Sequence, residues 1–392
     1  MPNSMKTMYS IKPIFYCIAL LNCYASVFYS NFLFFYMKGH FGFGDLENLL
    51  LAAFNGMVYA FSSWKCGGFA QRFGYARSIY IGCIGFASAM VAGLLLHTVA
   101  AQIIVFGVWT ISVCFIWPAL EAIICEGSET KISDRVGTYN LIWAGGSATA
   151  YFTTGMILER FGMQSLFRIP LCLVAVETVV LSTVIFIFRK RKFSPAVATA
   201  TVMTSRPPMS KRFMHMAFLA NPLSYVAINT VLPLIPSISS TMGLSTAAAG
   251  IVCSIWMFAR LGTFALLWRW TGWHYRFRWL AGAMLGLLVS FTVLILARSI
   301  PLMLAAQIGF GASVGLIYYS SLYYSMNASE KRGANGGLHE AMIGTGLFLG
   351  PLCGAGAIVL LPASNAGTWS VSGLLAAGLS ALLWMGRFRM KR

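Results

Sequence analysis

Long runs of apolar residues without a single charge dominate the chain. No Asp, Glu, Lys or Arg occurs in five stretches, which cover 13–37, 78–120, 213–259, 299–329 and 341–386. A helix needs about 20 apolar residues to cross a bilayer core about 30 Å thick, because each residue adds about 1.5 Å. The second, third and fifth stretches are far longer than one such helix, so each is expected to hold a helical hairpin.

The pattern of apolar runs predicts twelve membrane-spanning helices. We expect them at 13–37, 48–66, 78–97, 100–124, 137–158, 166–188, 213–237, 247–268, 279–297, 301–326, 337–361 and 368–386. A transmembrane β-barrel would instead alternate apolar and polar residues in segments of about ten. The runs in this chain are continuous and rich in Leu, Ala and Gly, so the predicted fold class is an all-α membrane protein.

The composition excludes several classes of protein. Of the 392 residues, 58% are hydrophobic and only 10% are charged, whereas a soluble domain carries about 25% charged residues. This excludes a soluble enzyme and a disordered chain. The net charge of +18 could suggest nucleic acid as a partner, but that would need a basic face on a soluble domain. The basic residues stand in short groups between apolar runs, so no nucleic-acid partner is expected.

The basic residues instead predict the orientation in the membrane, because cytoplasmic loops are enriched in Lys and Arg. Of the 28 basic residues, 23 lie in the segments on one side and four on the other, with Arg260 inside a span. Both termini are therefore predicted to lie in the cytoplasm.

The first span lacks a small-residue cleavage site and is longer than a signal-peptide core, so we expect it to remain in the mature protein. The nine cysteines form no CxxC or Cys/His cluster, so neither a metal site nor a disulfide framework is predicted.

One long polar segment divides the spans into two sets of six. We predict an N-terminal six-helix bundle at 1–188, a basic cytoplasmic linker at 189–212 and a C-terminal six-helix bundle at 213–392. A weak internal repeat at an offset of about 200 residues supports a duplication. Gly137 and Gly146 correspond to Gly337 and Gly346, and glycines at matched depth mark close helix packing.

The short loop after the second span carries the most specific motif of the sequence. It contains Gly67, Gln71, Arg72, Gly74 and Arg77. With the twelve spans and the central linker, this loop resembles the signature loop between helices 2 and 3 of major facilitator superfamily transporters. In that family an Asp stands at the position of Gln71 and belongs to a charge relay that holds the two halves together. Gln71 can still accept a hydrogen bond from an arginine, but it lacks the negative charge.

The resemblance implies a cavity between the two halves, lined mainly by spans 1, 4, 7 and 10 with contributions from spans 2, 5, 8 and 11. The proton-driven drug exporters of the superfamily carry a Gly-x-x-x-Gly-Pro-x-x-Gly-Gly pattern in span 5. This chain has Gly146 and Ala150 there without the proline, and a better copy in span 11 at Gly346, Gly350 and Pro351. Membership of that exporter subfamily is therefore not indicated by span 5.

Charged residues inside the spans are the first candidates for function, because burying an ion in lipid is costly unless it is paired or hydrated. They are Glu121, Glu177, Arg260 and Glu340, and His339 stands beside the last. We hypothesise that Arg260 pairs with Glu121 or Glu340 and that this pair is remade during transport. His339 and Glu340 together could carry a proton. The alternative is a fixed salt bridge, or carboxylates solvated near the headgroups. Glu177 lies in a peripheral span, and we predict a structural role for it.

Neutral polar and aromatic residues complete the set of candidates. The polar ones are Asn22, Asn140 and Asn229, and the aromatic ones are Trp117, Trp143, Tyr319 and Tyr323. Each of these residues could equally serve helix packing. Rings in spans 4 and 10 suggest stacking on a flat solute.

The sequence predicts a secondary active transporter that moves a small organic solute by alternating access, with protons as the expected coupling ion. The alternatives are a proton-driven exporter of drugs or metabolites, a non-transporting sensor and an intramembrane enzyme. There is no Gly-x-x-x-x-Gly-Lys-Ser/Thr loop for nucleotide hydrolysis, and no cofactor is predicted. We expect a monomer in the bacterial inner membrane, with the lipid bilayer as its surroundings.

Overall fold

The chain folds into long helices that run back and forth through one bundle. The computed structural model describes residues 3–125, 132–190, 208–328, 332–361 and 366–389. The helices are α1 Asn3–Phe41, α2 Asp45–Phe73, α3 Tyr75–Leu95, α4 Val99–Cys125, α5 Ile132–Phe161, α6 Ser165–Lys190, α7 Pro208–Val231, α8 Ile235–Thr241, α9 Thr246–Arg269, α10 Phe277–Leu296, α11 Ile300–Ala328, α12 Arg332–Leu360 and α13 Ala366–Arg389. A 3-10 turn, η2, joins α7 to α8 at Leu232–Leu234. The described residues contain no β-strand.

The predicted all-α membrane fold is confirmed. Apart from the short α8, every α-helix in the described residues has 20 or more residues, and each of the twelve predicted spans overlaps one of these long helices. Within the described residues, ten helical segments are long and apolar enough to cross a membrane. The two long helices outside that set, α2 and α5, carry polar residues along their length and charged residues toward both ends. Both pack against helices of the other half of the chain.

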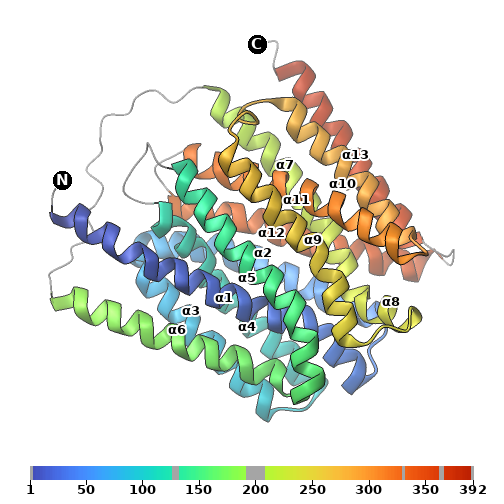
Figure 1. The fold of residues 1–392 in the computed structure, drawn as a ribbon, viewed down its shortest axis with the longest axis horizontal. Coiled ribbons are helices and arrows are strands. Elements are labelled where there is room, and N and C mark those ends of the chain that lie inside the picture. The colour runs from blue at the N-terminus through green and yellow to red at the C-terminus, as the bar shows by residue number, and fades with distance from the viewer. Residues whose placement is uncertain (1–2, 126–131, 191–207, 329–331, 362–365, 390–392) are drawn as a thin grey trace.

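Helices from the first and second halves occupy different sides of the molecule and meet along two long contacts. In Figure 1 the blue to green helices fill one side, and the yellow to red helices fill most of the other. Across the boundary, α2 packs along α12 and α5 packs along α9. The span predicted at 213–237 is interrupted near its outer end, because Pro233 and Pro236 flank the turn between η2 and α8 and proline removes backbone hydrogen bonds.

Glycines permit the close approach of helices at both long contacts. A methyl group on Gly344 of α12 would lie 2.4 Å from the backbone nitrogen of Ala60 in α2, and one on Gly155 of α5 would lie 2.3 Å from the carbonyl oxygen of Thr246. Small residues are what allow two helix backbones to touch in this way. The expectation that the repeated glycines mark close packing is confirmed, since methyl groups on Gly137, Gly146, Gly337, Gly346 and Gly350 would also lie within 3.1 Å of neighbouring atoms.

The motif loop between α2 and α3 consists of a single residue. Gly74 separates the two helices and has a φ of 102°, a conformation that side-chain-bearing residues rarely adopt. Gly67 lies at the contact with α12, where a methyl group on Gly337 would come within 2.8 Å of its Cα. Gln71, Arg72 and Arg77 are exposed at the same end of the bundle, and Gln71 accepts a hydrogen bond of 3.0 Å from the Tyr75 hydroxyl.

Candidate functional site

A cavity lies at the centre of the bundle, where helices of both halves converge. Its volume is about 200 Å³, and its lining residues come from α1, α2, α4, α5, α7, α9, α11 and α12, with one from η2. These eight helices are the spans that the family resemblance implied. The expected main share of spans 1, 4, 7 and 10 is wrong, because α4 and α11 contribute one lining residue each while α5 contributes four. Eight of its lining side chains are aromatic: Tyr59, Trp117, Tyr139, Trp143, Tyr151, Tyr225, Trp256 and Tyr318.

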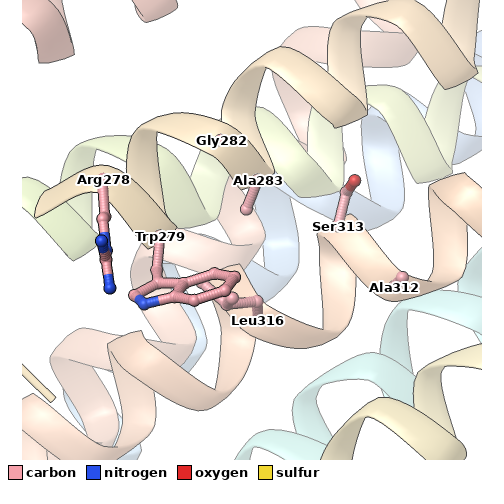
Figure 2. Close-up of a pocket in the computed structure, with 7 residues that line it drawn as sticks. All are labelled: Arg278, Trp279, Gly282, Ala283, Ala312, Ser313 and Leu316. Carbon is pink, nitrogen blue, oxygen red and sulfur yellow. The ribbon is translucent and has the colours of Figure 1, made fainter. Parts of the chain in front are cut away.

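A second hollow lies away from this centre, between α10 and α11. It has a volume of about 540 Å³ and is lined by Arg278, Trp279, Gly282, Ala283, Ala312, Ser313 and Leu316. Figure 2 shows that most of these side chains are short and that Trp279 lies across one end of the hollow. Its one charged lining residue, Arg278, is exposed. The larger hollow therefore lacks the buried ionisable groups that distinguish the central cavity.

Arg260 is the cationic group of the central cavity. Its side chain is 2% exposed, and its guanidinium carbon lies 4.6 Å from the ring centre of Trp143 and 4.7 Å from that of Tyr318. The rings of Tyr225 and Phe264 lie 5.9 Å and 5.4 Å away. One guanidinium N–H donates a hydrogen bond of 3.4 Å to the Tyr225 hydroxyl, and the buried Nε has no hydrogen-bond partner among the described residues. Aromatic faces thus surround a buried cation.

The predicted pairing of Arg260 with Glu121 or Glu340 is not made in this structure. Among the described residues Arg260 has no ion pair, and its one hydrogen bond is to Tyr225. The physical reason is the aromatic ring system around the guanidinium, which attracts it through cation–π interactions. The two glutamates lie together instead.

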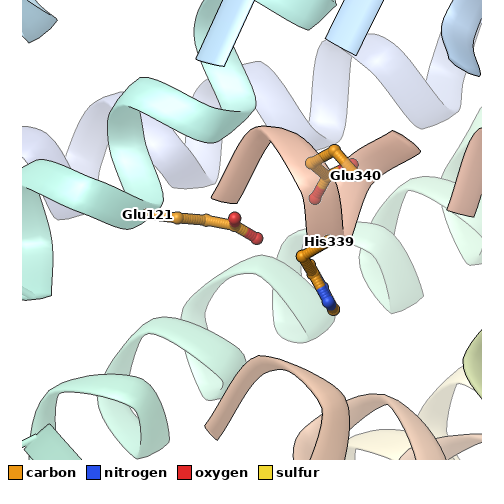
Figure 3. Close-up of side chains that lie close together, drawn as sticks. All are labelled: Glu121, His339 and Glu340. Carbon is orange, nitrogen blue, oxygen red and sulfur yellow. The ribbon is translucent and has the colours of Figure 1, made fainter. Parts of the chain in front are cut away.

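A compact acidic cluster lies on the cytoplasm-facing side predicted for the cavity. Figure 3 shows Glu121 reaching from α4 toward the turn of α12 that carries His339 and Glu340. One ligand atom from each residue lies within 4.8 Å of the others, a spacing that could hold a metal ion. The sequence predicted no metal site, because Glu121 lies far along the chain from the adjacent pair His339 and Glu340 and no sequence motif connects them.

Hydrogen bonds differ sharply within this cluster. The Tyr59 hydroxyl of α2 donates to Glu340 Oε2, so helices of the two halves are joined at this point. Both carboxylate oxygens of Glu121 are buried without a hydrogen-bond partner among the described residues. His339 shares a hydrogen bond of 3.0 Å between its Nδ1 and the Ser321 hydroxyl, while its Nε2 is buried and, within the same part of the chain, unpartnered. The cluster therefore contains buried polar atoms with unused capacity to bind a proton or ligand.

Four further predicted residues lie at or beside the cavity. Trp117, Trp143 and Asn229 line it directly, and Asn140 lies behind Trp143, accepting a hydrogen bond of 3.1 Å from its indole nitrogen. Asn229 donates to the Tyr225 carbonyl oxygen at 3.1 Å, and its side-chain oxygen accepts no hydrogen bond from another described residue. Asn140 therefore positions a lining ring and does not itself line the cavity.

Three predicted candidates lie outside the cavity. Asn22 of α1 donates a hydrogen bond of 3.0 Å to Glu177 of α6, which gives the structural partner expected for that glutamate. Tyr319 packs on Phe264 and Trp273, with ring centres 5.7 Å and 5.4 Å away. Successive residues on a helix point about 100° apart, so the cavity receives Tyr318 instead of its neighbour.

Tyr323, the third of these candidates, packs on the loop between α9 and α10. Its ring stacks on His274 at 4.3 Å between ring centres. Burial lowers the pKa of His274 from 6.5 to about 4. The neutral histidine is thus the form that the folded protein accommodates.

We therefore expect the folded protein to lose stability as the pH falls from about 6.5 toward 4, because the unfolded chain binds a proton at this histidine and the folded one does not. His274→Phe, which keeps the stacking and cannot titrate, should flatten that dependence. Thermal unfolding of the purified protein at pH 7 and pH 5 measures the effect. His97→Phe, at an exposed position, is the control. An unchanged pH dependence in His274→Phe would contradict the assignment.

The sequence missed several residues of the cavity. Tyr225 lies one helical turn before the candidate Asn229, and Tyr139 lies one helical turn before the candidate Trp143, so helical spacing from these candidates could have found both. Tyr59 has no such neighbour, and nothing in the sequence indicates its bond to Glu340. That contact depends on the packing of α2 along α12.

Comparisons with known proteins agree with this geometry. No family model matches the chain, and no curated protein matches it in sequence. Many solved structures match the chain, and two of them are crystal structures that match nearly its whole length. The human organic anion transporter MFSD10 (TETRAN) has a TM-score of 0.73 and 14% identity, covering 97% of this chain and 100% of its own. A mutant of the nucleoside transporter NupG has a TM-score of 0.69 and 13% identity, covering 96% and 99%.

The chain has the fold of a major facilitator superfamily transporter. The fold expected from the loop motif and the twelve spans is thereby confirmed, and the chain is a multi-pass membrane protein. The two similar structures carry names that refer to different solutes, an organic anion and a nucleoside. The fold therefore does not identify the solute, which has to be inferred from the residues that line the cavity.

Proposed function

We propose that this chain is a secondary active transporter that moves a small organic solute across a membrane by alternating access. The observation that carries the proposal is the central cavity, where eight helices bring buried charged groups together. Ionisable residues at membrane depth are costly and mark transport pathways. Both similar structures are transporters, which supports transport over the intramembrane enzyme and the sensor considered above.

The moving parts in this proposal are two six-helix bundles, 1–188 and 213–392, joined by the linker 189–212. Most of that linker, 191–207, lies outside the described residues. Contacts between the halves at both ends of the bundle support the proposal. Near the end of α1 the Lys38 amine donates to the Ser237 hydroxyl at 2.8 Å, and near the start of α5 Gly137 packs on Trp268. During alternating access, the contacts at one end of the bundle would break while the contacts at the other end remain.

We infer that protons drive the transport through Glu121 and Glu340. Two ionised carboxylates so close together in a low-dielectric interior would repel each other strongly, and a proton shared between them removes that repulsion. Tyr59 donates to Glu340 across the boundary of the halves. Uptake or release of the proton would therefore change a contact between α2 and α12, which is the link between protonation and movement.

The orientation belongs to the same proposal. We place both termini in the cytoplasm and the protein in the bacterial inner membrane as a monomer, because the basic residues concentrate on one side. No nucleic acid or cofactor takes part.

Counterflow in proteoliposomes tests the transport function. Purified full-length protein is reconstituted with an unlabelled solute inside, and entry of the same labelled solute is followed. The panel contains an aromatic carboxylate, a nucleoside, a sugar and an amino acid. We expect saturable entry of at least one compound, recovered chemically unchanged. Entry of none, or conversion into a different compound, would contradict the proposed function.

A further inference from the structure

The buried guanidinium of Arg260 lacks an anionic partner among the described residues. A guanidinium carries five N–H donors and is charged at all relevant pH values. Only one donor is used in a hydrogen bond within that part of the chain, and that bond is long, at 3.4 Å. Cation–π contacts with Trp143 and Tyr318 offset part of the cost of burying this cation. They do not neutralise its charge, so the site lacks a compensating negative charge.

The acids near the cavity do not supply that charge. Glu340 is the one acidic residue among the cavity lining, and its carboxylate is engaged by the Tyr59 hydroxyl beside Glu121. Glu177 lies elsewhere, bonded to Asn22 and Cys83. The positive end of the cavity is therefore available to a ligand from outside the protein.

The aromatic side chains around Arg260 favour a ligand that has a flat apolar part next to its negatively charged group. Trp143 and Tyr318 approach the guanidinium from its neighbouring helices, and Tyr225 and Trp256 line the same cavity. Aromatic rings prefer offset or edge-to-face contact with other rings. The cavity volume of about 200 Å³ sets the size, because a cavity of about 150 Å³ accommodates benzene.

We propose that the transported solute is a small aromatic carboxylate of one or two rings, held by a salt bridge between its carboxylate and Arg260. This rests on the transporter function proposed above. The planar fork of a guanidinium matches a carboxylate with two parallel hydrogen bonds. The ring lies among Trp143, Tyr318 and Tyr225, and the free side-chain oxygen of Asn229 can accept from a donor on the solute.

Matched pairs of ligands test the charge requirement. Benzoate is compared with benzamide, and indole-3-acetate with indole-3-acetamide, by titration calorimetry on the full-length protein in detergent at constant ionic strength. Each amide has the shape of its carboxylate without the charge. We expect at least one carboxylate to bind saturably and its amide to bind at least tenfold more weakly. Equal binding of acid and amide, or no binding of any of the four, would overturn the proposal.

Substitutions of Arg260 test whether this residue supplies the positive charge that binds the carboxylate. Arg260→Gln should weaken carboxylate binding roughly tenfold to hundredfold, the range for loss of a charged hydrogen-bond partner. Arg260→Lys should give an intermediate loss, since it keeps the charge but not the fork. Arg269→Gln, at an exposed position on the same helix, should bind like the original protein. Unchanged binding by Arg260→Gln would overturn the proposal. If that variant does not fold, Arg260→Lys and the ligand pairs decide.

The binding and counterflow results together distinguish a failure of the proposed anion site from a failure of the proposed transport function. A carboxylate that binds through Arg260 but does not exchange in counterflow would leave the anion site standing and contradict transport. A neutral solute that exchanges equally well in the original protein and in Arg260→Gln would leave transport standing and contradict the anion site.

Discussion

Gly344→Ala is expected to reduce solute transport by about fivefold to 150-fold. The added methyl group would lie 2.4 Å from the backbone nitrogen and 2.5 Å from the Cα of Ala60. Backbone atoms cannot rotate away, so α2 and α12 would have to separate. Overpacking of this kind costs about 1–3 kcal/mol, which corresponds to the stated change in the population of the state with the halves in contact. Counterflow rates measure the loss, and thermal unfolding measures the accompanying fall in stability.

Gly356→Ala on the same helix is the matched control. A methyl group there meets no atom within 4 Å, so transport and stability should stay as in the original protein. Both substitutions replace glycine by alanine within α12 and so change helix propensity in the same way. A difference between the two variants therefore reports the effect of the close contact alone. If both variants transported normally, the close contact of α2 with α12 would not take part in the transport cycle.

The fold could be predicted from the sequence because membrane insertion depends on simple patterns. Charge-free stretches and the basic segments between them indicated the number of long helices and the hairpins. The break after α7 was less clear, since the span at 213–237 was expected as one helix. Pro233 and Pro236 lie at that break, but prolines also occur inside unbroken helices of this chain, as Pro118 does in α4.

The site was predicted only in part, because depth along a helix is readable from sequence and rotation about its axis is not. Arg260, Glu121 and Glu340 were found as buried charges at membrane depth. Their partners were not, since the sequence could not show that Arg260 faces Trp143 and Tyr318. The same limit explains why Tyr319 was chosen where its neighbour Tyr318 lines the cavity.

Glu340→Gln is expected to abolish the accumulation of solute driven by a pH gradient, while counterflow continues. Glutamine has nearly the shape of glutamate and keeps an oxygen that can accept from the Tyr59 hydroxyl, so the contact between α2 and α12 remains. It cannot take up or release a proton, so the solute can exchange but cannot be driven uphill. Accumulation of the solute identified by counterflow, measured with an imposed pH gradient, should fall at least tenfold, until the internal concentration of the solute no longer exceeds the external one.

Glu177→Gln is the matched control for the loss of a buried acid. Glu177 is fully buried in α6 and accepts a hydrogen bond from Asn22, which glutamine can also accept, and it lines no part of the cavity. Accumulation should therefore persist in this variant. Glu121→Gln should behave like Glu340→Gln, because the proposed proton is shared by the two carboxylates. Full accumulation in Glu340→Gln would show that the gradient acts through another group. Loss of both accumulation and counterflow would assign Glu340 to solute binding or to the movement of the halves instead of proton coupling.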